Sequence, residues 1–149
     1  MIKIKALSVH QPWATLIVDD EPEVRKSVEV RSWKTSYRGP LLICAGKTLD
    51  ETTDEKFNEN ARNNPDVYPL GVAVGVVTLV DCVPLDLSMA EEAYWNPEDD
   101  PTGLYAWLLS SPIWFDDYFP VRGMPGLMDV GLPPSAIGEL QGTPYADER

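Results

Sequence analysis

The side chains that could do chemistry are concentrated in three short segments near the N-terminus, Ser8–Trp13, Lys26–Trp33 and Tyr37–Pro40. Positive side chains in these segments could contact phosphate, and a planar guanidinium group could pair with the edge of a base through two hydrogen bonds. Aromatic rings beside them could stack on an unpaired base. Together these contacts would suit an unpaired nucleotide. The residues expected to contact it are His10, Gln11, Trp13, Lys26, Glu29, Arg31, Trp33, Tyr37 and Arg38.

Glu29 is the one carboxylate in the central segment, and its position allows three roles. Between Lys26 and Arg31 it is expected to stay ionised and to orient the two cations. Beside a desolvated Lys26 it could instead act as a general acid or base, which would make Lys26 and Glu29 the catalytic pair if the chain is an enzyme. Glu29 and Arg31 could also form only a ladder of opposite charges along one strand face.

His10 is the only histidine, so any catalysis that needs an imidazole depends on it. It could lie near a bound anion or serve only as a structural hydrogen-bond donor. Cys44 and Cys82 are the only cysteines, and both lie in apolar runs that predict buried thiols. Two cysteines and one histidine do not suggest a zinc site, and no sequence pattern suggests a cofactor, so neither a metal nor a cofactor is expected.

Composition and charge limit the kind of partner. The 149 residues are 44% hydrophobic and 24% charged, enough for one globular domain, and the net charge of -12 argues against bulk attraction to nucleic acid or anionic membrane. Residues 1–47 carry eight Lys and Arg against five Asp and Glu, a local charge of +3. This polarity favours a specific single-stranded or small target over long duplex. Without a long apolar run or a secretory signal, we expect no membrane association and a cytoplasmic location.

The elements that must position these side chains are short. Alternation over residues 2–7 and 27–33 predicts half-buried strands, and the second strand places Glu29, Arg31 and Trp33 on one face. Pro12 suits the first turn of a helix over residues 12–18. Further strands are expected at 41–45, 72–80, 104–109 and 113–115, and further helices at 53–63 and 88–93. In these elements, Trp13 could pack in the core instead of stacking on a base, and Trp107 is expected to be a core residue.

This pattern predicts an α+β fold, a curled or closed β-sheet with a short N-terminal helix and small peripheral helices. Residues 1–140 are expected to form a single domain. Residues 141–149 have little to bury and are expected to be a mobile tail.

Several motifs resemble those of the ASCH domain, a member of the PUA-like β-barrel superfamily, over roughly residues 4–127. They are His-Gln-Pro-Trp-Ala-Thr-Leu from His10, Lys-Ser-Val-Glu-Val-Arg-Ser-Trp from Lys26, Tyr-Arg-Gly-Pro-Leu-Leu-Ile from Tyr37, Gly75–Val77 with Asp81–Cys82, and Tyr105–Trp107. The resemblance implies a β-barrel with a cleft beside the first helix that holds RNA or other nucleic acid. The Lys-x-x-Glu-x-Arg segment would line this cleft, through Lys26, Glu29 and Arg31. An acidic stretch from Asp19 to Arg25 replaces the family's usual turn before this motif.

The favoured function is therefore binding of a single-stranded or extruded nucleotide, in RNA more than in DNA. The resemblance also implies a second possibility, because some small ASCH-like proteins hydrolyse N4-acetylcytidine with a lysine, a threonine and a glutamate, and others are ribonucleases. Lys26 matches the lysine, but Glu29 stands at the threonine position, and Glu91 or Glu92 would have to supply the carboxylate. Hydrolysis is therefore the alternative to binding.

A third possibility is a module that recognises a protein partner or a modified nucleoside without catalysis. The acidic surface and the Gly- and Pro-rich segment from Gly123 to Pro134 would permit it.

Overall fold

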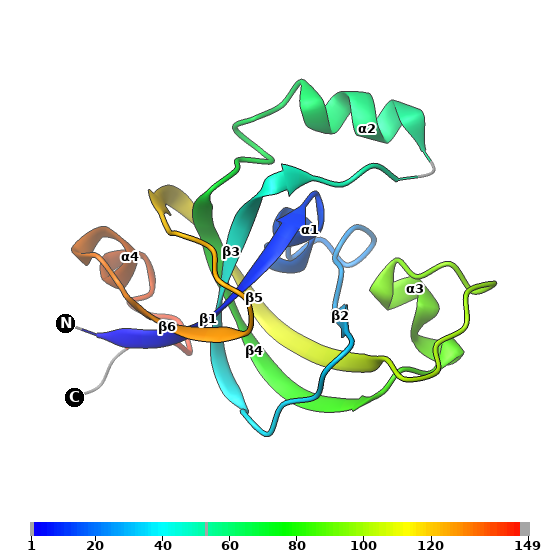
Figure 1. Ribbon diagram of the computed structural model, residues 1–149. Helices are drawn as coiled ribbons and strands as arrows, with labels where there is room; N and C mark the ends of the chain where they lie inside the picture. The colour runs from blue at the N-terminus through cyan, green and yellow to red at the C-terminus, as the bar shows by residue number, and fades with distance from the viewer. Residues whose placement is uncertain (1, 53, 147–149) are drawn as a thin grey trace.

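The computed structural model describes residues 2–52 and 54–146 (Figure 1). Six strands and a few short helices follow one another along the chain. In order they are β1 (Lys3–Gln11), α1 (Trp13–Val18), β2 (Val28–Arg31), β3 (Gly39–Leu49), α2 (Glu55–Arg62), β4 (Val72–Pro84), the 3-10 helix η1 (Leu87–Met89), α3 (Ala90–Ala93), β5 (Tyr105–Pro120), β6 (Leu127–Gly131) and α4 (Pro134–Glu139). The α+β class expected from the sequence is confirmed.

The strands form one mixed sheet in the order β2-β5-β4-β3-β1-β6. β1 runs parallel to β3, and all other neighbours are antiparallel. The expectation of a closed barrel is only partly supported, because β2 and β6 are the two edges of the sheet and do not pair with each other.

The two outer strands of the open sheet are short. β6 pairs with β1 from Lys3 only as far as Leu7, which lies opposite Leu127, so the end of β1 has one edge without a strand partner. β2 has four residues and pairs only with β5. Backbone polar groups at such open edges must find other partners. The opening between β2 and the end of β1 is where the candidate site lies.

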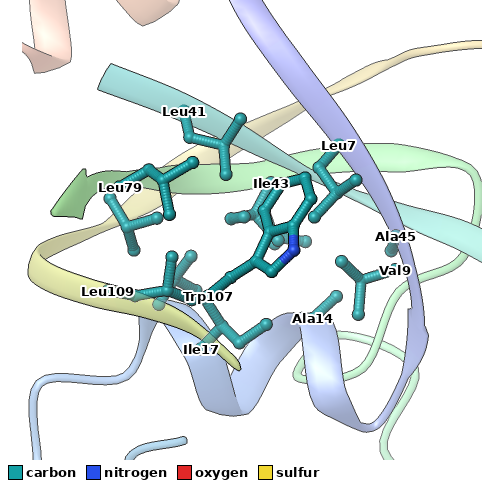
Figure 2. Packing of buried hydrophobic residues seen from close by; sticks show 13 residues of the cluster. Leu7, Val9, Ala14, Ile17, Leu41, Ile43, Ala45, Leu79, Trp107 and Leu109 are labelled. Carbon is teal, nitrogen blue, oxygen red and sulfur yellow. The ribbon is translucent and has the colours of Figure 1, made fainter. Parts of the chain in front are cut away.

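The main core lies between α1 and the concave face of the sheet, around the indole of Trp107 (Figure 2). Trp107 is fully buried, as expected, and Ile17 and Ala14 of α1 pack close to it. Burying a side chain such as Ile17 contributes roughly 1.5–3 kcal/mol of stability. α1 is therefore fixed against the sheet, and its first residue, Trp13, is held at the rim of the core.

Several elements differ from the sequence expectation. Residues 104–109 and 113–115 were expected as two strands but belong to one long β5, whose pairing with β4 shifts register at three places. β6 and α4 were not predicted, because residues 122–134 are rich in Gly and Pro, which usually mark loops. The helix expected over residues 53–63 is α2, and its N-cap is Asp54, whose carboxylate accepts from the Phe57 N–H.

The C-terminal residues make specific contacts. The Tyr145 hydroxyl hydrogen bonds to the Thr78 hydroxyl at 2.7 Å and donates to the Ser111 carbonyl at 2.7 Å. The Tyr145 ring packs against a second group of buried apolar residues, which includes Leu42, Val76 and Phe115. The expectation of a mobile tail also covers residues 147–149, which lie outside the described residues.

The two thiols differ in burial. Cys44 is fully buried, as expected, and burial raises its pKa to about 12. Cys82 is only half-buried. None of the described helices has the length and apolar character needed to cross a membrane.

Candidate functional site

A cleft of about 460 Å³ opens between the end of β1, the start of α1, β2 and the segment after α3. Its polar lining consists of His10, Lys26, Glu29, Arg31, Ser32 and Asp50. Its aromatic lining consists of Trp13, Trp33, Tyr94 and Trp95. The cleft therefore combines ring surfaces with charged groups in one opening.

Lys26 lies deep in this cleft and is only 4% exposed. Its backbone N–H donates to the Leu16 carbonyl of α1, which fixes the segment before β2 against the helix. Its Nζ donates to the carbonyls of Val28 at 2.7 Å and Ala93 at 2.6 Å, and lies 3.5 Å from Glu29 Oε1. Burial lowers the pKa of Lys26, and the nearby Glu29 carboxylate opposes this shift.

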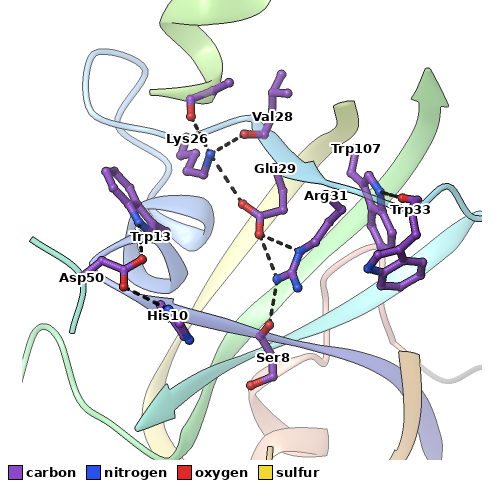
Figure 3. Close-up of polar contacts among 11 residues, drawn as sticks. Ser8, His10, Trp13, Lys26, Val28, Glu29, Arg31, Trp33, Asp50 and Trp107 are labelled. Carbon is purple, nitrogen blue, oxygen red and sulfur yellow. Dashed lines mark hydrogen bonds and ion pairs between the residues drawn. The ribbon is translucent and has the colours of Figure 1, made fainter. Parts of the chain in front are cut away.

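Glu29 joins Lys26 to Arg31 (Figure 3). Glu29 is 7% exposed, and its Oε2 accepts from Arg31 Nε at 3.0 Å and lies 2.9 Å from Arg31 Nη2. The alternation predicted for β2 places the two side chains on one face, as expected from the sequence. Arg31 Nη2 also donates to the Ser8 carbonyl at 2.8 Å. The three charged groups thus form one connected row along the floor of the cleft.

Asp50 connects two further lining residues. Its Oδ1 lies 3.0 Å from His10 Nδ1, and its Oδ2 accepts from Trp13 Nε1 at 3.2 Å (Figure 3). The Asp50 N–H donates to the Gln11 carbonyl, which ties the end of β3 to the end of β1. Asp50 therefore orients both the imidazole and the indole at the mouth of the cleft.

The aromatic walls are held by neighbouring rings and charges. Trp33 meets Trp107 edge-on, with ring centroids 4.7 Å apart, and its carbonyl accepts from Trp107 Nε1. Trp13 lies 5.7 Å from the Tyr94 ring and 5.7 Å from Lys26 Nζ, within the range of a cation–π contact. In Figure 3, Trp13 and Trp33 lie on opposite sides of the charged row.

Three residues predicted to contact a nucleotide do not line the cleft. Gln11 is fully buried, and its amide is occupied by Thr15 and the Pro69 carbonyl. Tyr37 donates to the Pro40 carbonyl at 2.5 Å, and Arg38 donates to Asp81 at 3.1 Å, both outside the cleft. The structure brings together His10, Trp13, Lys26, Glu29, Arg31 and Trp33.

The structure also resolves which cation before β2 reaches the cleft. Arg25 and Lys26 are adjacent in the sequence, and only Lys26 lines the cleft. Arg25 donates to the Leu109 carbonyl at 2.7 Å. The acidic stretch that precedes the motif therefore leaves Lys26 in the inward position.

Three polar or aromatic residues that line the cleft lie outside the three segments singled out from the sequence: Asp50, Tyr94 and Trp95. Asp50 follows β3 in a stretch without a motif, so only the tertiary fold brings it to His10. Tyr94 ends α3 with a left-handed backbone (φ 53°, ψ 37°), which is uncommon for a residue other than glycine. The one signal in the sequence for Tyr94 and Trp95 was that two aromatic residues directly follow the helix expected over residues 88–93.

This arrangement suits a planar, polar ligand. Arg31 donates from Nε to Glu29 and from Nη2 to the Ser8 carbonyl. No described residue accepts from its Nη1. Nη1 can therefore donate to a ligand, Glu29 Oε1 can accept from one, and the rings beside them can stack on it. In the part of the chain that the structure describes, no group of three or more His, Cys, Asp or Glu side chains is arranged to hold a metal ion.

Comparison with known sequences gives one family. A family model described as the ASCH domain matches residues 7–117. The human activating signal cointegrator 1 is 31% identical over 129 residues, which cover 80% of this chain and 21% of that protein. The mouse protein of the same name is 32% identical over 127 residues with the same coverage. The chain thus spans about a fifth of the length of these curated relatives.

Comparison with solved structures agrees on the fold. A mutant of the ASCH protein from Zymomonas mobilis matches with a TM-score of 0.53 and 16% sequence identity. The match covers 91% of this chain and 94% of that chain. At this identity the likeness concerns the fold alone.

Proposed function

The chain belongs to the ASCH domain family, and on this basis we propose that its cleft binds one unpaired nucleotide of a single-stranded nucleic acid, with RNA preferred over DNA. RNA offers such nucleotides in loops, bulges and ends, where bases are free to stack on protein rings. In this proposal Arg31 and Glu29 contact the edge of the base, and Trp13 or Trp33 stacks on its face. Lys26 positions Glu29 from below.

The observation that carries the proposal is the charged row Lys26–Glu29–Arg31 lying between aromatic walls, with Lys26 and Glu29 buried and Arg31 partly exposed. Burying charged groups is costly unless they are paired, and here Glu29 pairs with both Lys26 and Arg31. The row presents a guanidinium donor and a carboxylate acceptor side by side. Together they match the mixed donor and acceptor edge of a nucleobase.

The net charge of -12 is compatible with this proposal. Strong electrostatic attraction along a backbone gives sequence-independent coating, which the acidic surface opposes. Stacking and edge contacts inside a cleft require only a few local cations. We therefore expect binding to short single strands and little binding to long duplex.

Hydrolysis of a modified nucleoside or of RNA is the second candidate, and the observation that favours it is the buried Lys26–Glu29 pair. Lys26 acting as a nucleophile would need a free lone pair. Burial lowers the pKa of Lys26, but its Nζ donates to two carbonyls and lies beside the Glu29 carboxylate, so its protons are already engaged by the protein. This geometry supports a positioning role for Lys26 and leaves hydrolysis in second place.

One experiment separates the candidates. Fluorescence anisotropy measures binding of short single-stranded RNA, the matching DNA strand and a duplex, while mass spectrometry follows the same RNA and a pool of modified nucleosides. Saturable binding of the single strand with unchanged masses is the expected result. A mass change that disappears in Lys26→Ala would support hydrolysis instead, and no binding with no mass change would leave a protein partner as the remaining reading.

A further inference from the structure

A second hollow, a groove of about 880 Å³, adjoins the cleft. It runs from the end of β1 past β3 to the segment 120–126 between β5 and β6. His10 and Arg31 line both the cleft and this groove, so the two openings meet at these side chains. A ligand that occupies the cleft can therefore continue into the groove without leaving the surface.

The groove is basic in a chain that is strongly acidic overall. Its ionisable lining residues are His10, Arg31, Lys47 and Arg122, and none of the residues that line it is Asp or Glu. The whole chain has 24 acidic residues against 12 Lys and Arg. The groove therefore has the opposite balance of charge from the chain as a whole.

Two of these cations are not neutralised by the protein. In the described residues, neither Lys47 nor Arg122 has a carboxylate within ion-pair distance, whereas Lys5 and Arg38 each have one and Arg62 has two. His10 and Arg31 do have partners, Asp50 and Glu29, and both carboxylates lie on the cleft side. Lys47 and Arg122 thus remain available to an anion outside the cleft.

The far wall of the groove is held close to β1. A side chain at Gly123 would place its Cβ 2.9 Å from Ser8 Oγ, so the segment 120–126 lies nearly against β1 at this point. The segment is also anchored at its start, where the Val121 N–H donates to the Gly71 carbonyl. The groove is therefore formed in the unliganded chain, which reduces the ordering cost of binding.

We propose that this groove binds the phosphodiester backbone of the strand whose nucleotide occupies the cleft. Lys47 and Arg122 contact its phosphates, and the strand crosses from cleft to groove beside His10 and Arg31. The inference rests on the proposed function and deepens it, because it makes the ligand a polynucleotide and not a free nucleoside. A lone phosphate or mononucleotide would use the same charges but could not fill both openings.

The test is a series of affinities against ligand length and salt. A nucleoside, a mononucleotide, inorganic phosphate and single strands of about four to eight nucleotides are compared at several salt concentrations. We expect affinity to rise by about tenfold or more from the mononucleotide to the longer strands, because added phosphates reach the groove. Lys47→Ala and Arg122→Ala should each weaken binding of the longer strands several-fold and lower the salt slope by about 1.

Matched controls lie on α2, away from both openings. Lys56→Ala removes an exposed lysine and Arg62→Ala removes an arginine there, and both should leave affinity and salt slope unchanged. If the longer strands bind no better than the mononucleotide, or if Lys47→Ala and Arg122→Ala bind like the controls, the groove proposal is wrong while the cleft proposal stands. Failure of the wild-type protein to bind any single strand would overturn both.

Discussion

Arg31 Nη2 donates to the Ser8 carbonyl at 2.8 Å, and this side chain joins two strands that share no backbone hydrogen bond. Ser8 lies just beyond the last residue of β1 that pairs with β6, and Arg31 is the last residue of β2. The bond therefore bridges the opening of the sheet. Because the same guanidinium holds Glu29, one residue both supports the cleft walls and orders its charged floor.

Replacing Arg31 with lysine should weaken both the structure and the binding. Arg31→Lys keeps the charge but removes the planar group that reaches Glu29 and Ser8 together. We expect about 1–3 kcal/mol lower free energy of unfolding and at least about tenfold weaker binding of a single strand. Urea unfolding and anisotropy measure the two effects. Arg38→Lys, which alters an exposed ion pair with Asp81, is the control, and equal effects in both variants would show that Arg31 has no special role.

Removing the charge of Glu29 should destabilise the fold. Glu29→Gln leaves Lys26 and Arg31 close together without the carboxylate between them, and breaking such a buried pair costs about 3 kcal/mol. Chemical denaturation measures the loss. The control is Glu91→Gln on the exposed side of α3, expected within about 0.5 kcal/mol of wild type. Similar stability of the two variants would contradict the described burial of Glu29.

Asp50 should affect binding more than stability. Asp50→Asn keeps the shape of the side chain but weakens its hold on His10 and Trp13 at the mouth of the cleft. We expect about threefold to tenfold weaker binding of a single strand and less than about 1 kcal/mol change in the free energy of unfolding. Asp81→Asn removes a comparable exposed charge outside the cleft. Binding by Asp50→Asn at the wild-type level would show that these two rings need no such support.

The Cys44 thiol should make stability fall at alkaline pH. Burial raises its pKa in the folded chain to about 12, so the unfolded chain loses this proton first, near its ordinary value of 9.0. The contribution of the protonated thiol to the free energy of unfolding is fully present below pH 9. It falls by about 1.4 kcal/mol per pH unit as the pH rises towards 12. Cys44→Val should remove this part of the decline. Parallel curves for the two proteins between about pH 9 and 11, measured by urea unfolding, would rule out this contribution.

The charged floor could be predicted from the sequence because it depends on local geometry. Strand alternation alone places Glu29 and Arg31 on one face, and Lys26 lies three residues before Glu29. Tyr37 and Arg38 lie near them in the sequence but belong to the turn into β3, which leads away from the cleft. Closeness in the sequence therefore did not predict which residues beyond β2 line the cleft.

The remaining features depend on tertiary contacts that leave no local pattern. Asp50 reaches His10 across 40 residues because β1 and β3 run parallel side by side. The open sheet depends on the short pairing of β6, which formed in a Gly- and Pro-rich region with no strand signal. Such pairings are decided by the packing of the whole sheet and not by the propensity of one segment.

The five tryptophans report directly on whether the cleft holds an unpaired nucleotide. Trp13, Trp33 and Trp95 line the cleft, whereas Trp114 lies outside it with its indole N–H on Tyr118. Titration of the 15N-labelled protein with a short single-stranded RNA, followed through the indole N–H signals, should shift the three cleft signals and leave that of Trp114 in place. RNA binding that moves the Trp114 signal and leaves the cleft signals unchanged would contradict the account.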